Sequence, residues 1–158
     1  MTEIGIHANM SDQATSHVVQ VLHAPFKRLS KSLQGDYGGS VEHLWIDLEL
    51  IASHARGDGR PLWPFRLQKR VSGRGHFGLL PSPDCFNVAH YSVRPDFTLI
   101  ASLPSEKVVR YALGLIYEST ATLLEKQKKL VGFDAALFRS RFLDVCRSLG
   151  YGIEEGAL

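Results

Sequence analysis

The sequence VEHLWIDLEL, residues 41–50, decides the fold, because apolar and polar side chains alternate along it. Successive side chains of a β-strand point to opposite faces of its sheet, so this alternation predicts a strand with one apolar and one polar face. The polar face carries an imidazole, an indole and two carboxylates: His43, Trp45, Asp47 and Glu49. Residues 65–71, FRLQKRV, alternate in the same way, and their polar positions are Arg66, Gln68 and Arg70.

The two segments are predicted to form a hairpin. Residues 57–59, Gly-Asp-Gly, lie between them, and Asp-Gly is a favoured hairpin dipeptide. In such a hairpin the carboxylates of the first strand face the arginines of the second. Each exposed cross-strand ion pair of this kind contributes a few tenths to about 1 kcal/mol.

Two further short strands are predicted after the hairpin, at residues 87–93 and 97–102, on either side of an Arg-Pro-Asp turn. If the first of these lies beside the hairpin, His90 and Arg94 join its polar face. Residues 1–10 alternate at Ile4 and Ile6, which is compatible with a brief edge strand.

Helical periodicity marks both ends of the chain. Apolar residues recur every three or four positions between Ser11 and Gly35, which predicts a helix that Pro25 kinks or divides. A strand over residues 17–23 is the competing interpretation, because three valines fall there. Apolar stripes over residues 108–123 and 138–149 predict two C-terminal helices, the second capped by Asp134.

These elements predict one α+β domain over residues 1–158. Its antiparallel sheet of about four strands lies in the middle of the chain and is packed by the N-terminal helix and the two C-terminal helices. A chain of this length forms a core without a disulfide or a structural metal. The sheet face opposite the helices is expected to meet solvent, as alternating strands permit.

Composition narrows the class of function. Lys plus Arg is 18 and Asp plus Glu is 16, a net charge of +2, so binding to nucleic acid through bulk charge is not expected. The basic residues of 66–76 adjoin an acidic strand, which argues against a phosphate-binding surface. The N-terminus lacks the pattern of a signal peptide, and no apolar run is long enough for a membrane span. The sequence therefore predicts a cytoplasmic protein with no membrane contact.

Motifs for catalysis are sparse. His43, Asp47 and Glu49 on one strand face could hold a divalent cation or transfer protons, but no second cluster of ligands completes such a site. Cys85 and Cys146 lack metal-ligand spacing, and residues 73–75 lack the lysine of a phosphate-binding loop. No catalytic residue, metal or cofactor is predicted. The alternative is a small metal-dependent nucleic-acid-processing enzyme that uses His43, Asp47, Glu49, Lys69 and His90.

The polar sheet face is the predicted site, and it is predicted to bind a protein. Tryptophan and arginine are favoured at the centres of protein interfaces, and this face combines them with charges of both signs. The predicted partner-binding residues are His43, Trp45, Asp47, Glu49, Arg66, Gln68, Arg70, His90 and Arg94.

Residues 61–71, PLWPFRLQKRV, and 87–97, NVAHYSVRPDF, resemble segments of bacterial immunity proteins, the small partners of polymorphic or contact-dependent growth-inhibition toxins. The resemblance covers about a seventh of the chain. It implies a non-catalytic cytoplasmic protein that binds a cognate toxin domain and neutralises it. No residue's role is carried over, because such interfaces differ between pairs. The slightly basic charge departs from the acidic character of many nuclease inhibitors.

Overall fold

The computed structural model describes residues 1–10, 16–39, 41–50, 66–71, 87–93, 95–126 and 132–153. At residues 66–71 and 87–92 the description covers the backbone. The elements of the described residues are β1 (Glu3–Met10), α1 (Ser16–Leu33), β2 (His43–Leu50), β3 (Arg66–Val71), β4 (Asn87–Val93), α2 (Phe97–Ser102), α3 (Ser105–Lys126) and α4 (Ala135–Ser148). The four strands form one sheet in the order β1-β2-β4-β3.

The first half of the chain is a strand–helix–strand unit. β1 and β2 pair in parallel over their whole length, with Glu3 opposite His43 and Met10 opposite Leu50. Parallel neighbours need a crossover connection, and α1 provides it by running back along β1. The N-terminal segment is thus a full edge strand of eight residues, longer than the alternation of two isoleucines indicated.

The helix α1 is continuous through Pro25, so neither two pieces nor a strand over residues 17–23 is correct. Its apolar stripe is buried at the predicted positions: Val18, Leu22, Phe26, Leu29 and Leu33. Burial of that stripe against β1, α3 and α4 offsets the cost of the proline, which removes one backbone hydrogen bond from the helix interior. The predicted cap at Ser11 lies outside the described residues.

The prediction of an antiparallel sheet is wrong, and so is the hairpin. β2 pairs with β4 in parallel, with Trp45 opposite His90, and β3 pairs with the far side of β4 in antiparallel fashion. Because β4 lies between β2 and β3, the carboxylates of β2 do not face the arginines of β3 on an adjacent strand. The alternation of β2 shows that the two faces of the strand differ, and it is compatible with either parallel or antiparallel neighbours.

The strand predicted over residues 97–102 is also wrong, since these residues form the short helix α2. Periodicity cannot separate a helix from a strand in so short an apolar run. The deciding feature is Asp96, whose carboxylate accepts a hydrogen bond from the N–H of Leu99 at 2.9 Å. This is an N-cap, and it satisfies one of the donors that a helix start leaves without a partner.

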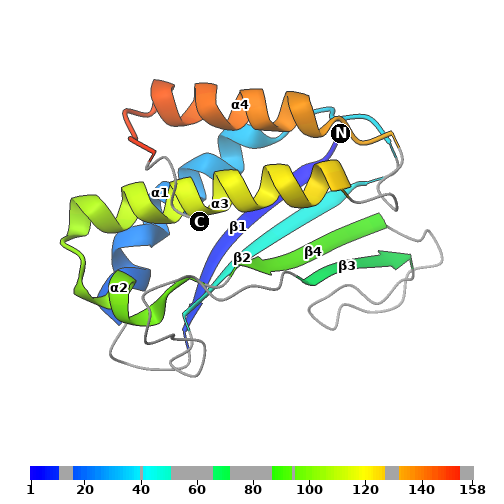
Figure 1. The fold of residues 1–158 in the computed structure, drawn as a ribbon. Coiled ribbons are helices and arrows are strands. Elements are labelled where there is room, and N and C mark those ends of the chain that lie inside the picture. The colour runs from blue at the N-terminus through cyan, green and yellow to red at the C-terminus, as the bar shows by residue number, and fades with distance from the viewer. Residues whose placement is uncertain are drawn as a thin grey trace.

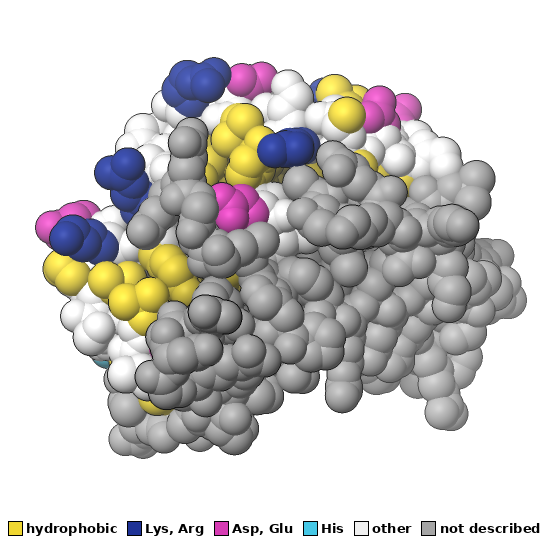
Figure 2. Space-filling model, in the orientation of Figure 1, with side chains coloured by type: hydrophobic (Ala, Val, Ile, Leu, Met, Phe, Trp, Pro, Cys, Tyr) yellow, Lys and Arg dark blue, Asp and Glu magenta, His cyan; other side chains and the backbone are white. Residues whose placement is uncertain are grey.

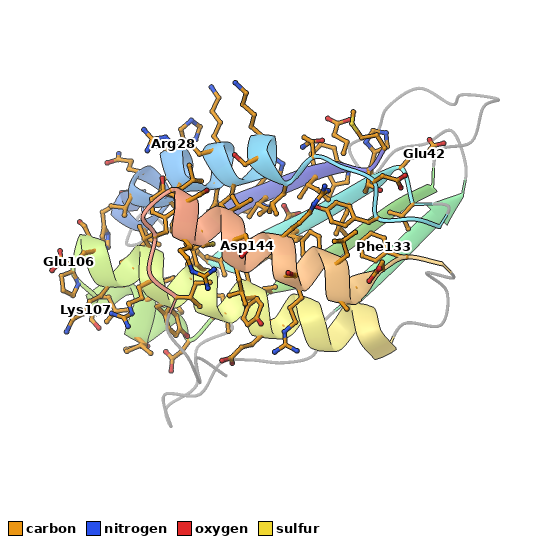
Figure 3. The ribbon with its side chains drawn as sticks, turned by 90° about the horizontal axis from the view of Figure 1, so that it is seen from above. Arg28, Glu42, Glu106, Lys107, Phe133 and Asp144 are labelled. Atoms are coloured by element: carbon orange, nitrogen blue, oxygen red, sulfur yellow. The ribbon has the colours of Figure 1, made fainter. Side chains whose placement is uncertain are left out.

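The predicted C-terminal helices are present as α3 and α4. Asp134 caps α4 by accepting from the N–H of Leu137 at 2.9 Å, and Gly150 follows its end with a φ of +75°. The helices α1 and α3 lie on one face of the sheet, and α4 lies on top of both (Figure 1). Viewed from above, α4 runs between α1 and α3 (Figure 3).

The core has two parts. Leu44, Ile46 and Leu48 of β2 are fully buried beneath the helices. Phe138, Phe142 and Cys146 of α4 are buried between α1 and α3. The outer side of α4 carries exposed charges of both signs, and over the top of the molecule such charges are interspersed with apolar side chains (Figure 2). Within the described residues, no helix combines the length and hydropathy that a membrane span requires.

The thiol of Cys146 makes the stability of the fold depend on alkaline pH. Burial raises its pKa from 9.0 to about 12, so on raising the pH the unfolded state loses this proton first. The stability contributed by the neutral thiol is complete below pH 9.0 and declines as the pH rises toward 12. Urea unfolding across this range should show a shallower decline for Cys146→Ala than for the wild type. Burial also raises the pKa of Tyr37, but its effect on stability is the same in both proteins and cancels in the comparison. Parallel declines for the two proteins would show that Cys146 is not the source of the pH dependence.

Candidate functional site

The predicted polar face is the side of the sheet opposite α1, α3 and α4 (Figure 1). The strand register brings residues from all four strands into rows across it. Trp45 lies between Gly5 of β1 and position 90 of β4, and position 68 of β3 continues that row. The neighbouring rows run through 3, 43, 88 and 70, and through 7, 47, 92 and 66. The sheet therefore brings together positions 43, 45, 47, 66, 68, 70 and 90 of the predicted site, although β2 and β3 are not neighbours as the predicted hairpin requires.

Three stacked rings on this face, those of His7, Trp45 and His43, form a group that we call the aromatic row. It runs diagonally across the rows of paired positions. The ring centroids of His7 and Trp45 are 5.3 Å apart with an interplanar angle of 20°. Those of His43 and Trp45 are 6.5 Å apart with an angle of 22°. Stacked rings hold one another in place, so the indole is a preorganised group. His7 is exposed, while Trp45 and His43 are half-buried.

Gly5 allows the indole to lie across β1. A Cβ atom at position 5 would come within 2.5 Å of Cε3 and 2.8 Å of Cζ3 of Trp45. Both distances are far below van der Waals contact, so only a residue without a side chain leaves room for the ring. The cross-strand pair of glycine and tryptophan sets the height of the indole above the sheet.

Gly5→Ala should therefore displace Trp45 and disturb its stacking on His7. We expect a destabilisation of about 1–3 kcal/mol, the usual cost of overpacking. The NMR signals of the Trp45 indole N–H and the His7 ring should both shift. Gly152→Ala is the matched control, because a Cβ there meets Arg110 only at 3.7 Å or more. Unchanged Trp45 and His7 signals in Gly5→Ala would show that the ring contact has been misassigned.

A carboxylate lies beside one end of the aromatic row. Glu3 Oε2 is 3.1 Å from Nδ1 of His43. The Glu3 side chain is 61% exposed and that of His43 is 25% exposed. A pair so open to solvent contributes little to stability.

The acidic part of the predicted face is less accessible than the sequence indicated. Asp47 is 3% exposed and Glu49 is half-buried. Asp47 therefore offers little surface to a partner, while Trp45 and His43 remain partly accessible. Positions 66, 68, 70 and 90 are placed by their backbone alone, and Arg94 lies outside the described residues.

The candidate metal site gains no support from the described part of the chain, where no three His, Cys, Asp or Glu side chains are grouped to hold a metal ion. Cys85 and the glycines of 73–75 lie outside the described residues, so their interpretation stays a prediction. The same is true of the side chain of Lys69.

Sequence reasoning missed the contribution of β1. Glu3, Gly5 and His7 alternate with the buried Ile4 and Ile6, and this alternation was the signal that could have placed them on the polar face. A groove of about 450 Å³ also follows β1. It is lined by the strand, by Trp45 and by the side of α1 that faces the strand, including Val19, His23, Phe26, Lys27 and Ser30.

Comparison with known protein families, with curated proteins and with solved structures finds no match to this chain.

Proposed function

We propose that this chain is a non-catalytic protein of the bacterial cytoplasm that binds another protein. We infer that its partner is a cognate toxin domain, which it neutralises as immunity proteins of polymorphic-toxin or contact-dependent growth-inhibition systems do. The observation that carries the proposal is the aromatic row, a stacked and partly accessible indole between two imidazoles on the sheet face opposite the helices.

The physical support comes from how such a group binds. A tryptophan that is already held by its neighbours loses little side-chain freedom on association, so more of its burial appears as affinity. The imidazoles and the exposed carboxylate of Glu3 surround it with polar groups. A hydrophobic centre with a polar rim is the usual composition of a protein interface.

The proposed contact surface is centred on Trp45 and His43, and it gains Glu3 and His7 from β1. Positions 66, 68, 70 and 90 follow in the same rows across β4 and β3. Asp47 is buried and Glu49 is half-buried, so in this proposal they stabilise the surface from below. Arg94 lies outside the described residues, and its place in the proposed contact surface rests on the sequence alone.

Co-expression with the product of the adjacent open reading frame tests the proposal. We expect the two proteins to co-purify as a stable complex, and cells that make this chain to survive production of the neighbour. Calorimetry would then give the affinity of the pair. The absence of a complex together with the absence of protection would refute the assignment.

A further inference from the structure

The outer edge of β1 pairs with no strand of the described residues. Backbone groups of successive residues in a strand point to alternate edges, and the N–H of Glu3 donates toward β2, to the carbonyl of Glu42 at 2.7 Å. The N–H and C=O groups of Ile4, Ile6 and Ala8 therefore point to the outer edge. An edge of this kind is a template for an added strand unless something covers it.

Side chains from the helix connection cover the first half of this edge. Gln34 accepts from the N–H of Ile4 at 3.2 Å and donates to its carbonyl at 2.9 Å. Ser30, one turn earlier in α1, accepts from the N–H of Ile6 at 2.9 Å. Because α1 runs antiparallel to β1, each turn of the helix lies beside the next pair of strand residues.

This cover ends at Ser30, because the corresponding side chain one turn earlier in α1 is apolar. One turn before Ser30 stands Phe26, which is buried and has no hydrogen-bonding side-chain group. Among the described residues, the outward carbonyl of Ile6 and both backbone groups of Ala8 have no side chain of α1 as a partner. These groups lie on the wall of the groove along β1.

The charged side chain beside this half of the edge is basic. Lys27 of α1 is exposed and lines the groove beside Ala8, together with the exposed imidazoles of His23 and His7. Glu3, the acidic residue that lines the groove, lies at its other end, beside the covered half. A second copy of this chain would bring Lys27 against the Lys27 of the other copy, whereas an acidic segment would neutralise its charge.

We propose that the C-terminal half of β1 accepts an extended acidic segment of the partner protein as an added strand. This deepens the proposed function, on which the identity of the partner rests. Backbone groups of the segment would bond to Ile6 and Ala8, and its acidic side chains would face Lys27 and His23. Recognition of this type takes its affinity from the main chain and its specificity from alternate side chains.

A short end-blocked peptide in which valine and glutamate alternate is the first probe, with its valine–lysine counterpart as the control. Titration into the full chain should shift the NMR amide signal of Ala8 and slow its hydrogen exchange. We expect dissociation constants of about 1 mM or lower for the glutamate peptide and at least roughly tenfold weaker binding of the lysine peptide. No change at Ala8, or equal binding of both peptides, would overturn the proposal.

Two substitutions with matched controls localise the effect. Ala8→Pro removes the outward donor, which is tolerated on an edge strand, while Ala8→Ser keeps it. Lys27→Glu reverses the charge in the groove, while Lys31→Glu makes the same change one turn away on α1, outside the groove. Ala8→Pro and Lys27→Glu should each weaken the glutamate peptide by about tenfold or more, and the controls should not.

The same variants separate this inference from the proposed function. If Trp45→Ala weakens the complex with the partner while Ala8→Pro and Lys27→Glu leave it unchanged, the sheet face binds the partner and the edge proposal is wrong. If the glutamate peptide binds as expected but the adjacent gene product does not, the edge site stands and the assignment of the partner fails.

Discussion

Phe142→Ala is expected to lower the free energy of unfolding by about 3–5 kcal/mol, the usual loss for a phenylalanine removed from a core. Phe142 of α4 is fully buried. The centroid of its ring lies 6.0 Å from that of Tyr117 in α3 and 6.3 Å from that of Phe138. Because α4 reaches the rest of the fold through α1 and α3, a cavity here loosens the whole helical side. Urea unfolding followed by far-UV circular dichroism measures the loss.

The melting temperature should fall by about 6–20 °C in the same variant, given the usual dependence for domains of this size. Leu137→Ala is the control, since it truncates an apolar side chain of the same helix that is 39% exposed. It should cost little, because surface substitutions usually change stability by about 0.5 kcal/mol or less. A Phe142→Ala protein as stable as Leu137→Ala would mean that α4 does not hold α1 and α3 together.

Trp45→Ala is expected to weaken the complex with the partner by about 30-fold or more, which corresponds to the 2 kcal/mol of an interface hot spot. The indole is half-buried, stacked and central in the aromatic row, so its truncation removes the largest contact area of the proposed surface. Calorimetric titration of the purified partner measures the change. The melting temperature should fall less than in Phe142→Ala, because the indole is half-buried and lies outside the helix-covered core.

Tyr151→Ala is the matched control for Trp45→Ala. Tyr151 is also half-buried, but it lies on the helical side, where its hydroxyl accepts a hydrogen bond from Arg28 at 3.3 Å. Its removal should leave the affinity unchanged. A collapse of the melting temperature in Trp45→Ala, or equal losses of affinity in both variants, would place the interface elsewhere.

The helical part of the fold could be predicted from the sequence because its signals are local. Asp134 and Gly150 bound α4 through contacts with residues three or four positions away. The stripe of α1 is periodic enough to identify the helix despite Pro25. Each of these features depends on neighbours along the same helix, which the order of residues already contains.

The strand partners could not be predicted in this way. The alternation of β2 shows that one face is apolar, but the same alternation suits a parallel or an antiparallel neighbour. Pairing is chosen by contacts between distant segments, here β1 with β2 and β2 with β4. The strand predicted over residues 97–102 is wrong for a different reason. The cap at Asp96 is a local signal, but so short an apolar run does not by itself distinguish a helix from a strand.

The sequence by itself determined which residues of β2 are polar and which are apolar, and where three of the helices lie. Only the tertiary structure decided that β1 adds Glu3, Gly5 and His7 to that face, and that Ser30 and Gln34 cover half of its edge. The physical reason is distance along the chain. The indole of Trp45 fits over Gly5, 40 residues earlier, and no local propensity reports whether such a contact is made.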